Sequence, residues 1–149
     1  MKLYLVQHAR PKPKEEDPER PLSDEGRLDA TKMAKFLSKL EIKTIIHSGK
    51  LRAQQTAEIF ANSLKVDIKK ESDLDPLSNP KVWHQKLQNQ TEDLMVVGHL
   101  PHLEKLASLL LCNDEEKKIV EFQQGGVVCL EKTENWSVRW AITPDLLSG

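Results

Sequence analysis

The stretch LYLVQHARPK, residues 3–12, decides the fold because an apolar run ends abruptly in polar and charged side chains. Residues 2–7 are short and apolar, and a charged, proline-rich segment follows them. This pattern is typical of a buried strand that enters a long loop. We therefore expect Gln7 and His8 to lie together at the carboxyl end of a first strand.

Working outward from this strand, helix and strand patterns alternate along the chain. Ser23 is followed by Asp24 and Glu25, which is an N-cap with acidic residues in the first turn, and a helix is predicted over about 24–40. Its apolar face is expected to contain Leu28, Met33, Phe36, Leu37 and Leu40. The next expected elements are a strand at 43–47, a second helix opening at Ser48 and Gly49, a short strand at 66–68, a polar helix at about 80–89, a buried strand at 94–98 and an apolar helix through about Leu111.

The C-terminal part shows a different pattern. Gly125 and Gly126 precede the apolar run VVCLE, and Trp136, Val138, Trp140 and Ile142 alternate with polar or small residues. This pattern predicts an antiparallel pair that closes the sheet.

The order of these elements predicts an α/β fold with a mostly parallel central sheet, covered by helices on both faces, and an antiparallel C-terminal edge. There is no internal repeat, so residues 1–149 are expected to form a single domain. Ligands of such sheets gather beyond the carboxyl ends of the strands. His8, His47 with Ser48, and His99 all follow predicted strands and are expected to converge there, although strand order is not set by the sequence.

Composition excludes several classes of partner. The chain has 22 Lys and Arg against 23 Asp and Glu, so it lacks the basic excess that drives nucleic-acid binding. Cys112 and Cys129 show no metal-ligand spacing and are expected to be buried free thiols. No apolar run approaches the roughly 18 residues of a membrane span. We expect a cytoplasmic protein with no signal peptide, no membrane segment and no nucleic-acid partner.

The residues at the strand ends fit phosphoryl chemistry. A neutral imidazole is a competent nucleophile toward phosphorus, and cationic or N–H donors must surround the charge that the transferring group spreads over its oxygens. Arg52 lies in the first turns of the second predicted helix, where the helix dipole favours an anion. His99 and Arg20 are further donors. Taken singly, a histidine at a strand end is more often structural and such an arginine more often a solvated charge; the combined placement carries the argument.

Four stretches resemble one family in order and spacing: VQHARPK, ERPLSDEG, SGKLRAQQTAE and VVGHLPHLEKL. The chain resembles the histidine phosphatase superfamily and, within it, the short SixA-type phosphohistidine phosphatases. The resemblance implies a phosphoglycerate mutase-like α/β/α sandwich in which His8 is phosphorylated during turnover. It further implies that Arg52 and His99 bind the phosphoryl oxygens and that Arg20 lies near the phosphate. Ser48 matches the family serine at the head of the helix, where N-capping explains it as well as ligand contact does.

The chain departs from the family's Arg-His-Gly motif at two positions. Gln7 stands where the arginine is expected and offers neutral N–H donors without a charge. Losing one transition-state donor costs ~2.7–4 kcal/mol, of which Gln7 should retain part. Arg10 could restore the charge, although a solvated loop residue is the preferred interpretation. Ala9 replaces the glycine and matters only if that backbone needs a positive φ.

No residue clearly matches the acid that larger family members use to protonate the leaving group. Glu71, Asp73 and Asp75 lie in the expected region, where acidic residues more often face solvent. An imidazole leaves more readily than an alkoxide, so the missing acid mildly favours a phosphohistidine substrate. His47, His84 and His102 are interpreted as structural or surface residues; of the three, His102 is the one most expected to line the pocket rim.

The leading hypothesis is therefore a phosphatase that acts through phospho-His8 on a phosphohistidine of a partner protein, such as a histidine phosphotransfer domain, without a metal or organic cofactor. In this hypothesis the phosphate ligands are Arg52, His99, Arg20, Gln7 and Ser48, with Arg10 as a further candidate. A small-molecule phosphomonoesterase of the same fold is one alternative. The other is a phosphate- or phosphoprotein-binding protein in which Gln7 marks weakened catalysis. The sequence does not determine the oligomeric state.

Overall fold

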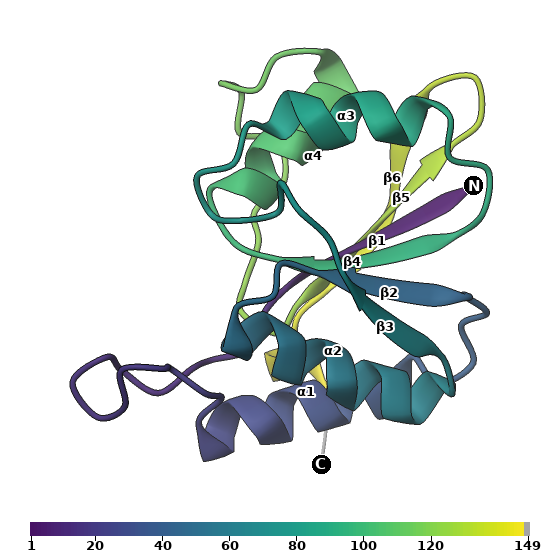
Figure 1. The fold of residues 1–149 in the computed structure, drawn as a ribbon. Coiled ribbons are helices and arrows are strands. Elements are labelled where there is room, and N and C mark those ends of the chain that lie inside the picture. The colour runs from purple at the N-terminus through teal and green to yellow at the C-terminus, as the bar shows by residue number, and fades with distance from the viewer. Residues whose placement is uncertain (148–149) are drawn as a thin grey trace.

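The computed structural model describes residues 1–147 and contains one six-stranded sheet with helices on both sides (Figure 1). The elements, in chain order, are β1 (Lys2–Gln7), α1 (Asp24–Phe36), β2 (Thr44–His47), α2 (Leu51–Leu64), β3 (Asp67–Lys70), α3 (Pro80–Gln88), β4 (Leu94–Gly98), α4 (His102–Cys112), β5 (Val127–Lys132), β6 (Trp136–Ile142) and a short 3₁₀ helix, η1 (Pro144–Leu146). The predicted types of these elements are confirmed, and most of their bounds agree to within two residues.

The strand order is β3-β2-β4-β1-β5-β6. β3, β2, β4 and β1 pair in parallel, whereas β5 pairs antiparallel with both β1 and β6. Helices α1 and α2 cover one face of the sheet, and α3 and α4 cover the other (Figure 1). The predicted α/β/α sandwich with an antiparallel C-terminal edge is therefore confirmed.

Each face of the sheet has its own apolar core because successive strand side chains point to opposite faces. Leu3 and Leu5 of β1 pack with Leu103 and Leu106 in the core under α3 and α4. Tyr4 and Val6 belong to the core under α1 and α2, which contains Met33 and Phe60. β1 is therefore buried on both faces, which explains why its sequence is a continuous apolar run.

Helix α1 is shorter than predicted and buries a different face. It ends at Phe36 instead of near residue 40, since Leu37 leaves the helical backbone, and Phe36 and Leu28 are 60% and 57% exposed. The buried positions are Gly26, Ala30, Met33 and Ala34. Small residues allow α1 to pack close to α2, where the Ser63 hydroxyl donates to the Ala34 carbonyl oxygen at 3.0 Å. The prediction that Leu28 and Phe36 face the core was wrong.

Both cysteines are free thiols, as predicted; Cys129 is buried and Cys112 half-buried. Across residues 1–147, no helix combines the length and apolar character needed to cross a membrane.

Gly26 holds the start of α1 against the loop that follows β1. A Cβ on Gly26 would clash with the carbonyl oxygen of Arg10, which also accepts hydrogen bonds of 3.0 Å from the N–H and hydroxyl of Ser23. Ser23 in turn caps α1, since its hydroxyl accepts from the Gly26 N–H at 3.0 Å. The segment RPLSDEG therefore clamps the loop after His8 onto the first turn of α1.

We predict that Gly26→Ala lowers the free energy of unfolding by about 1–3 kcal/mol, because the added methyl group meets backbone that cannot move without breaking these bonds. Thr31→Ala, at an exposed position of the same helix, is the control and should change stability little. Urea denaturation measures both variants. Equal midpoints for Gly26→Ala and wild type would show that the clamp is not rigid.

Candidate active site

His8 lies directly beyond β1 in a buried position. Its backbone N–H donates to the carbonyl oxygen of Gly98, the last residue of β4, at 3.0 Å. Its ring Nδ1 lies 2.8 Å from the carbonyl oxygen of Ala9. A carbonyl can only accept, so the hydrogen-bond network assigns the ring proton to Nδ1 and leaves the lone pair on Nε2.

The surroundings of His8 keep the imidazole neutral. Burial lowers the pKa of His8 from 6.5 to about 4; the hydrogen bond to Ala9 opposes this shift, and the charges of Arg52 and Arg20 add to it. At pH 7 the ring therefore carries a free Nε2 lone pair. A neutral, oriented imidazole is the form that attacks an electrophile.

His99 lies beside His8 because β4 is the parallel neighbour of β1. The two ring centroids are 5.0 Å apart. Burial lowers the pKa of His99 to about 3, with further lowering by electrostatic interaction with His8, Arg52, Lys50 and His102. His99 Nε2 and the Ser48 hydroxyl share a hydrogen bond of 2.6 Å, while the buried Nδ1 has no partner.

Ser48 does not cap the second helix. Helix α2 begins at Leu51, its N-cap is Lys50, and no side chain caps it. The Ser48 hydroxyl accepts from the Lys50 N–H at 3.3 Å. With its oxygen accepting there, its proton is available for His99 Nε2, which leaves Nδ1 of His99 as a protonated donor. The capping interpretation of Ser48 is therefore wrong, and its contact is with His99.

Arg52 projects from the first turn of α2 and is half-buried. Burial lowers its pKa, the charge of Arg20 lowers it further, and Asp75 opposes the shift. Its Nε is buried without a partner. Burial and a nearby like charge both penalise the guanidinium, so an anion bound here would relieve an existing cost.

Two motif residues to which the sequence analysis assigned no role tie α2 to the site. The Thr56 hydroxyl accepts from the Ala9 N–H at 3.0 Å and donates to the Arg52 carbonyl oxygen at 2.8 Å. The Gln55 side-chain oxygen accepts from the Leu22 N–H at 2.7 Å. Their signal was present in the stretch SGKLRAQQTAE, which the resemblance used only as a match.

Gln7 and Arg20 are the two remaining residues that the sequence analysis placed near the phosphate. Gln7 is buried, its backbone oxygen accepts from the Gly125 N–H at 2.9 Å, and its side-chain Oε1 is buried without a partner. Arg20 has a positive φ of 52° and donates from Nε to the Lys12 carbonyl oxygen at 3.3 Å. Its charge contributes to the low pKa of His8, so the long loop brings Arg20 toward the histidine.

Arg10 is not brought together with these residues. Its guanidinium forms an ion pair of 3.0 Å with Glu25, and both side chains are more than half exposed. It lies as the solvated loop residue that the sequence analysis preferred. Ala9 is fully buried and has no positive φ, so the replaced glycine causes no backbone strain at this position.

The remaining acidic candidates, Glu71, Asp73 and Asp75, line a surface cavity that also contains Ser48. Asp73 and Asp75 are exposed, and Glu71 pairs with Lys69 at 3.1 Å. His47 is buried, and its Nδ1 accepts from the Gly49 N–H at 3.1 Å. Within residues 1–147, no three His, Cys, Asp or Glu side chains are grouped closely enough to hold a metal ion.

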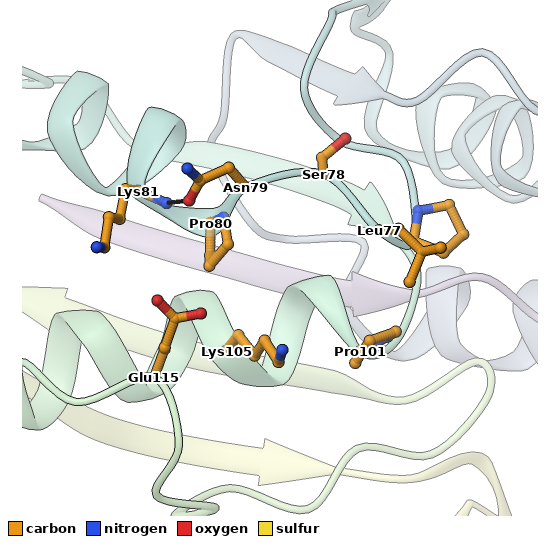
Figure 2. Close-up of a pocket in the computed structure, with 9 residues that line it drawn as sticks. Leu77, Ser78, Asn79, Pro80, Lys81, Pro101, Lys105 and Glu115 are labelled. Carbon is orange, nitrogen blue, oxygen red and sulfur yellow. Dashed lines mark hydrogen bonds between the residues drawn. The ribbon is translucent and has the colours of Figure 1, made fainter.

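Two surface cavities contain residues near the histidines, Ser48 in one and Pro101 in the other. The first, of about 380 Å³, is lined by Ser48, Gly49, Lys50, Lys70, Glu71, Ser72, Asp73 and Asp75, and neither His8, His99 nor Arg52 is among its lining residues. The other, of about 350 Å³, lies between the segment 76–81 and α4 and contains neither histidine nor arginine (Figure 2). Of these two cavities, only the first is lined by Ser48, which is hydrogen-bonded to His99.

Two neutral histidines and two arginine charges lie at the carboxyl edge of an α/β/α sandwich, an arrangement suited to binding an anion next to an imidazole. The sequence profile of the histidine phosphatase superfamily (branch 1) matches residues 3–95, and the chain belongs to that family. No curated protein matches the chain by sequence.

Solved structures share the fold over nearly the whole chain. The protein histidine phosphatase SixA, complexed with tungstate, has a TM-score of 0.85 and 24% identity over 98% of this chain and 99% of that chain. A candidate SixA from Agrobacterium tumefaciens gives 0.79 and 20% over 96% and 97%. A candidate α-ribazole-5'-phosphate phosphatase from Escherichia coli K-12 gives 0.83 and 15% over 97% and 98%. At these identities the likeness establishes the phosphoglycerate mutase-like fold.

His102, at the start of α4, shows how the buried histidines couple stability to pH. It is 1% exposed, and neither ring nitrogen has a partner. Burial lowers its pKa from 6.5 to about 4, against the opposing charges of Asp73 and Asp75. The folded state therefore keeps His102 neutral where the unfolded chain already binds a proton. This contribution is fully present above about pH 6.5 and is lost as the pH falls toward 4.

We predict that His102→Leu flattens the fall in stability between pH 7 and pH 5 by about 2 kcal/mol, at 1.36 kcal/mol per pKa unit. The slope that His8 and His99 cause should remain. Thermal and urea unfolding at both pH values measure the effect, with His84→Gln on α3 as the control. A variant with the wild-type slope would contradict the buried, neutral state of His102.

Proposed function

We propose that the protein is a phosphatase that hydrolyses phosphohistidine on a partner protein through a phosphorylated His8. The observation that carries this proposal is the state of His8: Nδ1 is held by the Ala9 carbonyl oxygen, so the neutral ring keeps its lone pair on Nε2. Family membership and the fold shared with SixA support it.

The reaction takes two displacements at phosphorus. First, a bond forms between His8 Nε2 and phosphorus while the bond to the substrate imidazole nitrogen breaks. The electron pair of the broken bond stays on that nitrogen, and the proton already on the other nitrogen of the substrate ring lets it leave as neutral imidazole. Then the oxygen of a water molecule bonds to phosphorus, the Nε2–phosphorus bond breaks, and inorganic phosphate and neutral His8 result. Splitting the transfer in this way replaces one difficult step by two easier ones.

The surrounding donors stabilise the transferring group in both steps. Arg52 and Arg20 supply positive charge, and the unpartnered Nδ1 of His99 donates to a phosphoryl oxygen. Gln7 contributes a neutral amide N–H. Ser48 acts on His99, because its hydrogen bond to Nε2 sets which ring nitrogen carries the proton.

A nitrogen leaving group suits this site. Across residues 1–147, neither histidine hydrogen-bonds to a carboxylate, and Asp73 and Asp75 are exposed. A substrate imidazole that carries a proton on its other ring nitrogen leaves as a neutral ring without an acid held against it, whereas an alkoxide needs one. We therefore favour a phosphohistidine over a phosphomonoester, with a histidine phosphotransfer domain as the partner and the cytoplasm as the compartment.

Gln7 favours one second candidate, a protein that binds phosphate or a phosphoprotein with little turnover. The amide brings no charge to the place where the family's motif has an arginine, and its buried Oε1 has no partner. Charge-assisted hydrogen bonds are roughly twice as strong as neutral ones, so transition-state stabilisation is weaker here.

The two candidates differ in what happens to His8. We predict that wild type hydrolyses phosphoramidate or a phosphorylated phosphotransfer domain, that His8→Ala loses the activity, and that acid-quenched wild type carries ³²P on His8. His84→Gln is the control and should keep the wild-type rate. Equal rates for His8→Ala and wild type would exclude catalysis, and phosphate binding without turnover would establish the binding protein. Preference for p-nitrophenyl phosphate would indicate a small-molecule phosphomonoesterase.

We predict that Gln7→Arg raises kcat by about 10- to 100-fold, since it restores part of a transition-state donor whose full loss costs about 10² to 10³ in rate. Gln7→Glu should abolish activity, because a carboxylate repels the phosphoryl oxygens. Steady-state kinetics with phosphoramidate measure both. An unchanged or lower rate for Gln7→Arg would show that the pocket is built around the amide.

A further inference from the structure

Gln7 is buried beside His8 and carries no charge. The positive charge available to a bound phosphoryl group therefore depends on the arginines and lysines around the site. Arg52 and Arg20 act on His8. Arg10, the nearest arginine in sequence, is held by Glu25 at 3.0 Å on the surface. Any compensation for Gln7 must therefore come from another element.

Lys50 is fixed at the edge of the site by its backbone. Its N–H donates to the Ser48 hydroxyl at 3.3 Å, and its carbonyl oxygen accepts from the N–H groups of Ala53 and Gln54 at 3.0 and 2.9 Å. The same Ser48 hydroxyl lies 2.6 Å from His99 Nε2. The Ser48 hydroxyl therefore bridges the backbone of Lys50 and the ring of His99.

The side chain of Lys50, in contrast, is not bonded to other protein groups within residues 1–147. Within residues 1–147 its ammonium forms no ion pair and no hydrogen bond, although the residue is half-buried. It lines the cavity of about 380 Å³ that begins at Ser48. Its charge acts on His99, where it contributes to the lowered pKa of that ring.

The carboxylates of this cavity leave Lys50 free. Glu71 is paired with Lys69 at 3.1 Å, and neither Asp73 nor Asp75 lies within ion-pair distance of the ammonium. Lys70 lies over Gly49, since a Cβ on that glycine would fall 2.5 Å from the Lys70 Cε. Two lysines thus form one wall of the cavity, and the one next to Ser48 is Lys50.

We propose that Lys50 binds the phosphoryl group of the substrate from the head of α2 and supplies the positive charge that Gln7 does not. The inference rests on the proposed function for its catalytic consequence, whereas its consequence for anion binding stands independently. The backbone of Lys50 bonds to the Ser48 hydroxyl, which also bonds to His99, so the lysine would approach the phosphoryl group from the side of His99. Within residues 1–147 no carboxylate pairs with its ammonium, so its charge is available to an incoming anion.

The test is a charge series at position 50: Lys50→Arg, Lys50→Gln and Lys50→Glu. Inorganic phosphate binding, followed by calorimetry, should weaken about tenfold in Lys50→Gln and further in Lys50→Glu, and Lys50→Arg should bind like wild type. The value of kcat/KM for phosphoramidate should fall in the same order. Lys39→Gln, in the exposed loop after α1, removes the same charge far from the site and is the matched control.

Combining the Lys50 variants with Gln7→Arg tests whether Lys50 replaces the charge that is missing at position 7 or only attracts anions in general. If Lys50 replaces the missing charge, Lys50→Gln should cost less than about threefold once arginine stands at position 7, because the two effects are not additive. Phosphate affinities within twofold of each other across the series, or additive effects, would overturn the inference. Equal rates for His8→Ala and wild type would overturn the proposed function alone, since phosphate binding still tests Lys50. All three substitutions keep the backbone bonds of residue 50, and Lys50→Arg controls for folding.

Discussion

The parallel pairing of β1 with β4 is the constraint on which the site depends. Gln7 is in register with Gly98, and the His8 N–H continues the ladder to the Gly98 carbonyl oxygen at 3.0 Å. A shift of one residue would turn Leu3 and Leu5 away from the core that they share with α4. Burial of these leucines therefore stabilises the register of β1 and β4, and this register places the His8 and His99 rings 5.0 Å apart.

Beyond β1, the backbone is held from three directions. The Ala9 N–H donates to Thr56 of α2, and the N–H of Gly125, which has a φ of 78°, reaches the Gln7 and His8 carbonyl oxygens at 2.9 and 3.2 Å. Ser23 holds the Arg10 carbonyl oxygen. If His8 is the nucleophile that we propose, a ring fixed in this way needs little reorganisation when the substrate binds, and the scaffold lowers the barrier without contacting the reacting atoms.

The sequence predicted what depends on local pattern. The apolar runs that end in His8, His47 and His99 located three strand ends, and parallel pairing brought His8 and His99 together. It did not predict what depends on tertiary contacts. Small residues of α1 pack more closely than Leu28 and Phe36, and a glycine turn moves the start of α2 beyond Ser48. No local sequence pattern indicates that Arg10 forms its ion pair with Glu25, because the two residues meet only in the folded chain.

The placement of charge around His8 follows from the cost of burying cations. Burial and Arg20 already lower the pKa of Arg52, so these two guanidinium groups destabilise one another while no anion is bound. An arginine at position 7, where Gln7 is buried beside His8, would add a third charge to this cluster. A lysine at the edge of the site would carry its charge in water and lose hydration only when a phosphoryl group offsets the loss. If Lys50 binds the phosphoryl group as we propose, the exchange of a buried guanidinium for a hydrated ammonium would favour the stability of the empty site over the fullest stabilisation of the transition state.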